Sequence, residues 1–292
     1  MLKHVASVVE ELGLVSPAHP MHYFINVTTG EAMSISAFAG KDGFLQIKAS
    51  EFVNLEREYQ CYQRAWTDFP GFVPRPLGYA IREQWHIMVS TGVRHSSFPA
   101  SLLRNFGRQE PQPVSDLLRF FEATHRYELP PGNSPHGALV SDLASFFEPT
   151  RYAALAMRWV AYSQLHGLEL MPQSPQHGDF VLNNLASSGG RLVVFDWEDY
   201  GNVNLGGLDL ATLCISVWGE DPTMVRTLMD VRVKLNAPMD LFVRKACGLA
   251  GIEFDVFRRQ IPLYVLTFLY LKRNYGEAVQ LRFGQLLEQL SV

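Results

Sequence analysis

The fold of this chain is decided by the stretch HGDFVLNN at residues 177–184, together with LVVFDW at residues 192–197. In the first stretch Asp179 and Asn184 lie five positions apart, and in the second Asp196 follows four apolar residues. Carboxylate and amide oxygens are ligands that magnesium prefers. The apolar run indicates a buried strand, which would fix Asp196 at its end.

Phosphoryl transfer by a kinase requires this set of residues. One Asp orients the attacking hydroxyl and accepts its proton, while an Asn and a second Asp hold magnesium beside the nucleotide's phosphates. The catalytic loop of protein kinases has the same Asp-to-Asn spacing. The pattern therefore predicts Asp179 as the catalytic residue, with Asn184 and Asp196 as metal ligands. Taken alone, each of the two stretches could instead belong to an ordinary polar loop before a buried strand.

The two stretches resemble the motif pair of the aminoglycoside phosphotransferase and choline kinase superfamily. That pattern is HGD, four residues, Asn, a strand ending in Asp-Trp or Asp-Phe, and a later Asp-Leu, here Asp209-Leu210. The resemblance implies an α+β, two-lobed protein-kinase-like fold, with an N-lobe antiparallel sheet and one helix, and a larger, mainly helical C-lobe. It also implies structural roles for His177 and Asp209, which would brace the catalytic loop.

The remaining elements follow from strand formers, turn residues and helical spacing. Strands are expected near residues 23–27, 34–38, 44–48, 77–80 and 85–89, with helices within 1–17 and at about 51–66. Further helices are expected from Ser115, over about 151–166, and throughout the chain beyond Asp209. We expect two domains, a nucleotide-binding N-lobe over 1–93 and a C-lobe over 94–292 with the catalytic loop, metal site and acceptor site.

Lys48 ends the third expected strand and resembles the strand-three lysine of kinases, which contacts the α- and β-phosphates. Its expected partner is an acid near or on the following helix, Glu51, Glu56 or Glu58. Glu58 is preferred because apolar residues follow it at helical spacing and the later VPRP at 73–76 resembles the family pattern. Such a pair would keep the lysine at the phosphates.

The nucleotide loop departs from the protein-kinase pattern, because no Gly-x-Gly-x-x-Gly follows the first strand. Only TTGEAMS at 28–34 occupies that place, so Thr29, Gly30 and Ser34 are the expected contacts of the nucleotide. The alternative is that Gly30 is a plain hairpin residue. Adenine is expected near residues 88–92, beside Met88 and Ser90. The implied cofactors are ATP, with GTP as an option, and Mg²⁺.

Glu198 and Asp199 follow Asp196 and are the expected acceptor contacts, with a solvated turn as the alternative. The predicted function is a small-molecule kinase that moves the ATP γ-phosphate to a hydroxyl of a small polar acceptor, an amino alcohol or a sugar. An aminoglycoside-type antibiotic phosphotransferase and an inactive kinase-like binding protein remain alternatives. Acidic residues do not markedly outnumber basic residues beyond Asp196, which disfavours a polycationic aminoglycoside as the substrate. Asp179, Asn184 and Asp196 are all present, which disfavours an inactive protein.

The composition of the chain indicates which partners and which cellular compartment to expect. The net charge of the 292 residues is −4 with no basic run, which argues against a nucleic-acid partner. Three scattered cysteines suggest neither disulfides nor a metal site and suit a reducing compartment. The most apolar run, 261–271, is too short to span a bilayer, and residues 1–17 lack a signal-peptide core. We therefore expect a cytoplasmic protein whose partner is a small molecule, not a membrane.

Overall fold

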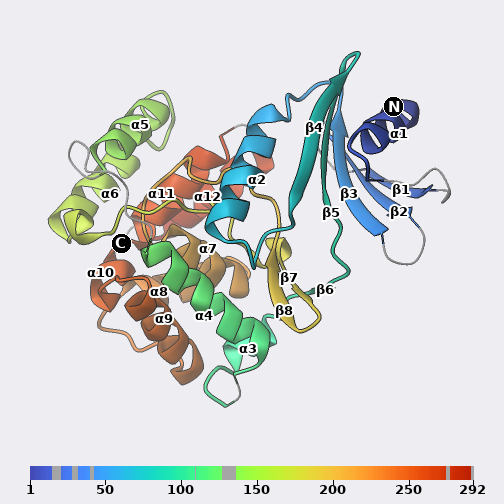
Figure 1. Cartoon of the computed structure of the whole chain (residues 1–292). Helices are drawn as coiled ribbons and strands as arrows, with labels where there is room; N and C mark the ends of the chain where they lie inside the picture. Colours follow the sequence, from blue (N-terminus) through green and yellow to red (C-terminus); the bar gives the residue numbers. More distant parts are fainter. Residues whose placement is uncertain are drawn as a thin grey trace. The chain divides into compact units, whose positions relative to one another are not determined.

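The chain forms a mixed α+β structure, which this computed structural model describes for residues 1–14, 21–27, 32–39, 43–108, 110–126, 136–273 and 277–290 (Figure 1). It separates into two units. The first comprises Met1–Ser96 and Val193–Glu198, and the second comprises Ser97–Leu192 and Asp199–Val292. Asp196 and Glu198 therefore belong to the first unit, whereas Asp179 and Asn184 belong to the second.

An antiparallel sheet of five strands dominates the first unit, in the order β1–β2–β3–β5–β4. The strands are β1 (Met21–Val27), β2 (Met33–Ala39), β3 (Gly43–Ser50), β4 (Pro76–Arg82) and β5 (Trp85–Thr91). The helices among the described residues of this unit are α1 (Leu2–Glu11) and α2 (Glu56–Asp68), and α2 packs on β4. The five expected strands and the N-terminal helix are all present.

The two faces of this sheet differ because side chains alternate along each strand. One face is apolar and packs against α1 through Val5, Val8 and Val9, forming the core of the unit. The opposite face has mainly polar residues on its central strands. Its members are Ser34, Ser36, Gln46, Lys48, Met88 and Ser90.

Helix α2 begins at Glu56, five residues later than the expected start at 51. The cause is a local turn, because the Ser50 hydroxyl accepts the backbone N–H groups of Phe52 (3.1 Å) and Val53 (2.9 Å). Asn54 then accepts the N–H of Glu56 at 2.9 Å. Short polar side chains that bond to nearby backbone favour such turns over helix.

The second unit is mainly helical. Its helices are α3 (Ser101–Arg104), α4 (Gln112–His125), α5 (Gly137–Phe147), α6 (Ala153–Leu165), α7 (Leu208–Val217), α8 (Pro222–Met229), α9 (Ala237–Leu249), α10 (Phe254–Arg259), α11 (Ile261–Leu271) and α12 (Glu277–Leu290). Helices α7 and α11 are buried almost throughout and contact each other, and α4 lies beside α9 (Figure 1).

The expectation that a helix starts at Ser115 was wrong. Helix α4 starts at Gln112, because Pro111 precedes it as the cap and Pro113 lies in its first turn, where proline is well tolerated. The expected helix over 151–166 is present as α6. The chain beyond Asp209 is helical as expected, with breaks near 221, 236 and 248–251.

Short elements carry the segment that decided the fold. The turn η2 (Leu182–Asn184) follows the HGD motif and leads into β7 (Leu185–Ser188) and then β8 (Arg191–Val194). These two strands form a three-stranded sheet with β6 (Ser96–Ser97), in the order β6–β7–β8. The hairpin thus separates Asn184 from Asp196 along the chain.

The remaining expectations concern the cysteines and the apolar run. All three cysteines are buried and unbonded to one another. The run 261–271 forms the buried core helix α11. Among the helices that the structure describes, none combines the length and the apolar character needed to cross a bilayer.

Candidate active site

Lys48 on β3 forms an ion pair with Glu58, which lies in the first turn of α2. Its Nζ atom is 2.7 Å from Glu58 Oε2 and 3.5 Å from Glu198 Oε2. Burial alone would lower the pKa of Lys48, but the neighbouring carboxylates of Glu58, Glu198 and Asp196 together raise it. Lys48 is therefore a fixed cation. Glu56, the alternative partner, is exposed to solvent.

Three carboxylates of the first unit gather around this lysine. Oxygens of Glu58, Asp196 and Glu198 all lie within 4.8 Å of one another. Carboxylate oxygens are hard donors, which suit Mg²⁺ better than they suit softer transition metals. The donor set therefore fits the expected assignment of Asp196 as a magnesium ligand.

Asp196 is held in an unusual backbone conformation by groups around it. Its φ is +63°, in the left-handed region, which costs a non-glycine residue about 1 kcal/mol and is found preferentially at functional sites. Its N–H donates to the Tyr62 hydroxyl at 3.1 Å. Trp197 is fully buried, stacks on Phe69 and donates to the carbonyl of Val194 at 2.8 Å. These contacts anchor the Asp196 segment on α2.

The polar face of the sheet places other expected cofactor residues beside Lys48. Ser34 on β2 and Met88 on β5 are the direct cross-strand neighbours of Lys48. The Gln46 side chain donates to the Ser34 hydroxyl, and the Ser90 hydroxyl donates to the Gln46 carbonyl at 3.4 Å. Ser34, Met88 and Ser90 therefore share one face of the sheet with Lys48.

In the second unit, Asp209 organises the start of the HGD motif. Its Oδ2 accepts the N–H of His177 at 2.8 Å, and its Oδ1 accepts the N–H of Gly178 at 3.0 Å. His177 is fully buried, and its Nδ1 accepts the N–H of Asp179 at 3.2 Å. Both side chains thus bond to the backbone of the loop that presents Asp179.

Asp179 and Asn184 are linked within this loop. The side-chain amide nitrogen of Asn184 donates to the Asp179 carbonyl at 2.8 Å, so its amide oxygen points elsewhere and is the atom suited to a metal. Asn183, the competing residue, is exposed. The Asp179 carboxylate lies 3.1 Å from the Nζ atom of Lys272.

Lys272, at the end of α11, joins two carboxylates in the interior of the second unit. It is 2% exposed, and its Nζ lies 2.9 Å from Asp199 Oδ2. The other oxygen of Asp199 accepts from Asn202 at 3.0 Å. Gly178 permits this arrangement, because its φ is +85° and a Cβ there would lie 2.9 Å from the Cβ of Asp199.

The expected site residues thus fall into two groups. Glu198 and Asp199, expected together as acceptor contacts, have different partners, because Glu198 contacts Lys48 and Asp199 contacts Lys272. Thr29 and Gly30 lie outside the described residues.

Sequence reasoning missed two residues of these groups. Lys272 is the first base after the apolar run 261–271, and a lone base at the end of a buried helix is a signal that could have found it. Tyr62 lies four residues after Glu58 and therefore on the same face of α2.

Replacing Lys272 with Met should lower the free energy of unfolding by about 3 kcal/mol, because it leaves two largely buried carboxylates without their cation. Urea denaturation measures this change. Lys245→Met is the matched control, since Lys245 pairs with Glu110 at the surface and its loss should cost less than about 1 kcal/mol. Equal losses in the two variants would show that Lys272 does not hold the carboxylates.

We expect Asp209 to make the stability of the protein depend on pH. Burial raises its pKa to about 7, against the lowering effect of the two backbone N–H groups, and the charge of Asp179 adds to the rise. The unfolded value is about 3.9. A raised folded pKa means that the stabilisation is complete below a pH of about 4 and is lost as pH rises through about 7.

We therefore expect the free energy of unfolding of the wild type to fall between about pH 6 and pH 8 by roughly 1 kcal/mol more than that of Asp209→Asn. Asn has the same shape but cannot ionise. Urea denaturation of both proteins at the two pH values measures the difference. Parallel pH dependences would mean that Asp209 is ionised throughout this range.

One comparison with known proteins identifies a family. A model described as the phosphotransferase enzyme family matches residues 44–232, which include Lys48, the HGD motif, Asp196 and Asp209. Among curated proteins, no match to this chain is found.

Solved structures resemble the whole chain at low identity. Choline kinase LicA from Streptococcus pneumoniae is 15% identical with a TM-score of 0.61, covering 100% of this chain and 99% of that one. A mutant of the aminoglycoside phosphotransferase APH(4)-Ia, in a complex with ADP and hygromycin B, is 15% identical with a TM-score of 0.59 and 98% coverage of both chains. A protein provisionally described as a fructosamine-3-kinase, from Haemophilus somnus 129PT, is 11% identical with a TM-score of 0.64, covering 100% and 98%. At this identity they show a shared fold.

Proposed function

From the premise that this chain belongs to the phosphotransferase enzyme family, we propose that it transfers the γ-phosphate of ATP to a hydroxyl group of a small polar molecule. The observation that carries the proposal is the Lys48–Glu58 pair with the Asp196 carboxylate beside it. A fixed cation on the sheet suits the α- and β-phosphates, and a carboxylate next to it suits the metal that accompanies them. The ADP in the similar APH(4)-Ia structure supports an adenine nucleotide.

Nucleotide binding is assigned to the polar face of the sheet. Lys48 contacts the α- and β-phosphates, and Glu58 stops its side chain from turning away. Ser34, Met88 and Ser90 lie on the same face and contact the nucleotide, as do Thr29 and Gly30 in this proposal. Residues 1–93 thus form the nucleotide-binding domain, and residues 94–292 supply the catalytic loop and the acceptor site.

The catalytic residue of the proposal is Asp179. It orients the acceptor hydroxyl and takes its proton as the oxygen bonds to the γ-phosphorus. The bond between that phosphorus and the bridging oxygen breaks, ADP leaves, and the proton passes from Asp179 to water. The two backbone bonds that Asp209 accepts, and the Lys272 contact, fix the position of Asp179.

Magnesium is part of the proposal because the available donors are hard oxygens. Asn184 and Asp196 would hold it through the amide oxygen and a carboxylate oxygen. Bound magnesium would neutralise charge on the β- and γ-phosphates. Glu198 lies within the same carboxylate cluster as Asp196, which supports a position beside the metal for its carboxylate.

The acceptor is proposed to be an amino alcohol or a sugar, with Glu198 and Asp199 among its contacts. The similar structures include a choline kinase and a protein described as a fructosamine kinase, which supports acceptors of this size. An aminoglycoside would need more acidic groups than these, and both carboxylates already have a lysine partner. We also propose that the protein works in the cytoplasm. A kinase needs a supply of ATP, and the three buried, unbonded thiols fit a reducing compartment.

The proposal predicts that ATP binds tightly only together with magnesium. Calorimetric titration of the wild type with ATP, in the presence of magnesium and then of a chelator, measures this. Screening polar alcohols for ADP release in the presence of magnesium then identifies the acceptor. Nucleotide affinity that the chelator leaves unchanged would contradict the metal assignment, and GTP in a parallel titration defines the base preference.

A further inference from the structure

Helix α2 contacts both the lysine and the metal ligand that the proposed function assigns to the first unit. Glu58, in its first turn, lies 2.7 Å from the Nζ atom of Lys48. Tyr62, one turn later on the same face, accepts the backbone N–H of Asp196 at 3.1 Å. One helix therefore connects the cation proposed for the phosphates with the carboxylate proposed for magnesium.

The Tyr62 hydroxyl bonds to a backbone group that needs a fixed partner. Asp196 has a φ of +63°, and a non-glycine residue stays in the left-handed region only where surrounding contacts hold it there. An N–H group that loses its acceptor inside a protein costs free energy. The buried hydroxyl thus stabilises the backbone conformation from which the Asp196 carboxylate projects.

The residues on either side of Asp196 are fixed by other contacts. Trp197 stacks on Phe69 with ring centroids 5.9 Å apart, and its indole N–H donates to the Val194 carbonyl at 2.8 Å. These contacts do not involve the Tyr62 hydroxyl. Loss of that hydroxyl alone should therefore disturb Asp196 and leave the segment folded in its place.

Tyr62 makes its contact without adding charge. A tyrosine hydroxyl is neutral at physiological pH and can accept an N–H group through its oxygen. A lysine or an arginine at the same place would compete with a metal ion for the Asp196 carboxylate. A neutral hydroxyl that bonds to the backbone suits a residue whose task is to orient that carboxylate.

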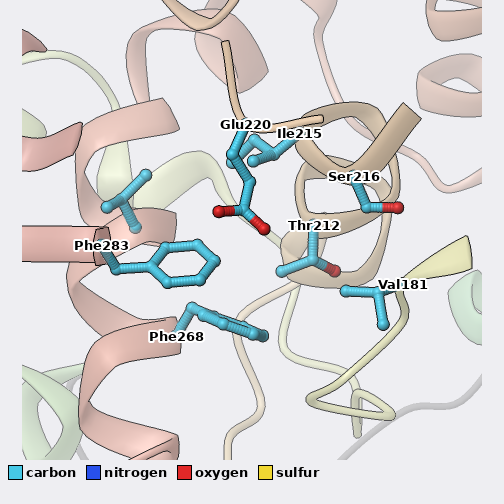
Figure 2. A pocket seen from close by; sticks show the side chains of 8 residues that line it. Val181, Thr212, Ile215, Ser216, Glu220, Phe268 and Phe283 are labelled. Atoms are coloured by element: carbon cyan, nitrogen blue, oxygen red, sulfur yellow. The ribbon is translucent and has the colours of Figure 1, made fainter. Parts of the chain in front are cut away.

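The catalytic loop of the second unit is held by a contact of the same kind. The Ser216 hydroxyl on α7 accepts the N–H of Leu182 at 2.9 Å, two residues before Asn184. Ser216 and Thr212 of α7 lie beside Val181 of this loop (Figure 2). In each unit, a side-chain hydroxyl from a helix thus holds the backbone at or near a proposed metal ligand.

We propose that Tyr62 is a positioning residue for magnesium, which sets the affinity of the site for the metal by fixing the backbone of Asp196. The proposal rests on the proposed kinase function and adds to it a residue that acts through Asp196. Removing a group that orients a metal ligand typically weakens metal binding by about tenfold or more.

Tyr62→Phe tests the proposal because it removes the hydroxyl and keeps the ring. Calorimetric titration with ATP at low magnesium should show about tenfold weaker binding than in the wild type, and additional magnesium should restore the affinity. In the presence of a chelator the two proteins should bind ATP equally, because Lys48 and Glu58 are unchanged. Equal binding at every magnesium concentration, or an equal loss with and without magnesium, would overturn the proposal.

Tyr59→Phe is the matched control. Tyr59 lies on the same helix, and its hydroxyl accepts from the Gln63 side chain at 3.3 Å on the exposed side. This variant should bind ATP as the wild type does at every magnesium concentration. A tenfold loss at low magnesium in Tyr59→Phe as well would show that the effect is not specific to Tyr62 and would overturn its assignment.

A double variant shows whether Tyr62 acts through Asp196. Two residues that act through one contact have effects that do not add. In an Asp196→Asn protein, Tyr62→Phe should therefore weaken magnesium-dependent ATP binding by less than about twofold further. A further tenfold loss would mean that Tyr62 acts elsewhere and would overturn the assignment.

Hydrogen exchange of the wild type tests the same coupling without any variant. Coupling between two sites is reciprocal, so a metal bound to Asp196 should strengthen the hydrogen bond between its N–H and Tyr62. The Asp196 amide should exchange more slowly with ATP and magnesium than with ATP and chelator. The slowing should exceed that of the Val8 amide in α1, which reports the stability of the unit. An equal change at both amides would overturn the proposal.

These measurements need neither an acceptor nor turnover, so they separate this inference from the kinase proposal. A wild type whose ATP affinity does not depend on magnesium would contradict the kinase proposal, and this inference with it. A wild type that requires magnesium, together with a Tyr62→Phe protein that matches it, would leave the kinase proposal standing and overturn only the role of Tyr62.

Discussion

Replacing Asp179 with Asn should reduce kcat by about a thousandfold and leave the affinity for magnesium-ATP within a few-fold of the wild type. A positioned proton acceptor contributes about 10²- to 10⁴-fold to a rate. Asn can still accept a hydrogen bond from the acceptor hydroxyl but cannot take its proton. Steady-state kinetics with the identified acceptor, together with calorimetric titration of ATP, measures both quantities.

The substitution also removes half of the Lys272 ion-pair network, so stability must be followed in parallel. Asp240→Asn is the matched control, because Asp240 pairs with Arg244 on the exposed surface of α9 in the same unit. It should keep both activity and nucleotide affinity. If a folded Asp179→Asn protein no longer binds nucleotide, Asp179 contacts the nucleotide and its assignment to the acceptor is wrong.

Replacing Asp196 with Asn should weaken ATP binding in the presence of magnesium by at least about tenfold and reduce kcat/KM by about 10²- to 10³-fold. Loss of a group that merely supports a metal ligand already costs about tenfold or more in metal affinity. Removing one electrostatic stabiliser of a transition state costs about 10²- to 10³-fold in rate. Asp179→Asn and Asp196→Asn should therefore differ most in their affinity for magnesium-ATP.

Calorimetric titration over a range of magnesium concentrations distinguishes a metal ligand from a structural residue. If Asp196 binds the metal, additional magnesium should partly restore nucleotide affinity to the Asn variant. Glu56→Gln is the control in the same unit, because Glu56 is exposed on α2. An Asp196→Asn protein that binds ATP as the wild type does, with or without magnesium, is incompatible with the proposed site.

Much of the fold followed from local patterns. Strand-forming residues separated by turn residues located the five strands, and the continuous apolar run 261–271 located the buried helix α11. The Lys48–Glu58 contact was also accessible, because a strand followed by a helix places few acids within reach of one lysine. In both cases the determining residues lie close together in the sequence.

The remaining features depend on side chains that meet only after folding. Lys272 is 93 positions from Asp179, and the spacing of charges along the chain does not reveal which base enters the interior. Such a contact is tertiary, so patterns of one or two turns do not encode it. The late start of α2 is different because its cause is local: the Ser50 hydroxyl accepts the backbone N–H groups two and three residues later.

The return of residues 193–198 to the first unit has a consequence for synthesis on the ribosome. Trp197 is fully buried against Phe69, and Val194 bonds to the carbonyl of Phe72 at 2.8 Å, so this segment completes the unit that residues 1–96 begin. Residues 97–192 are made in between. The nascent N-terminal unit therefore lacks these contacts until almost a hundred further residues have emerged. A fragment ending at residue 96 would lack its last buried tryptophan and should be prone to aggregation.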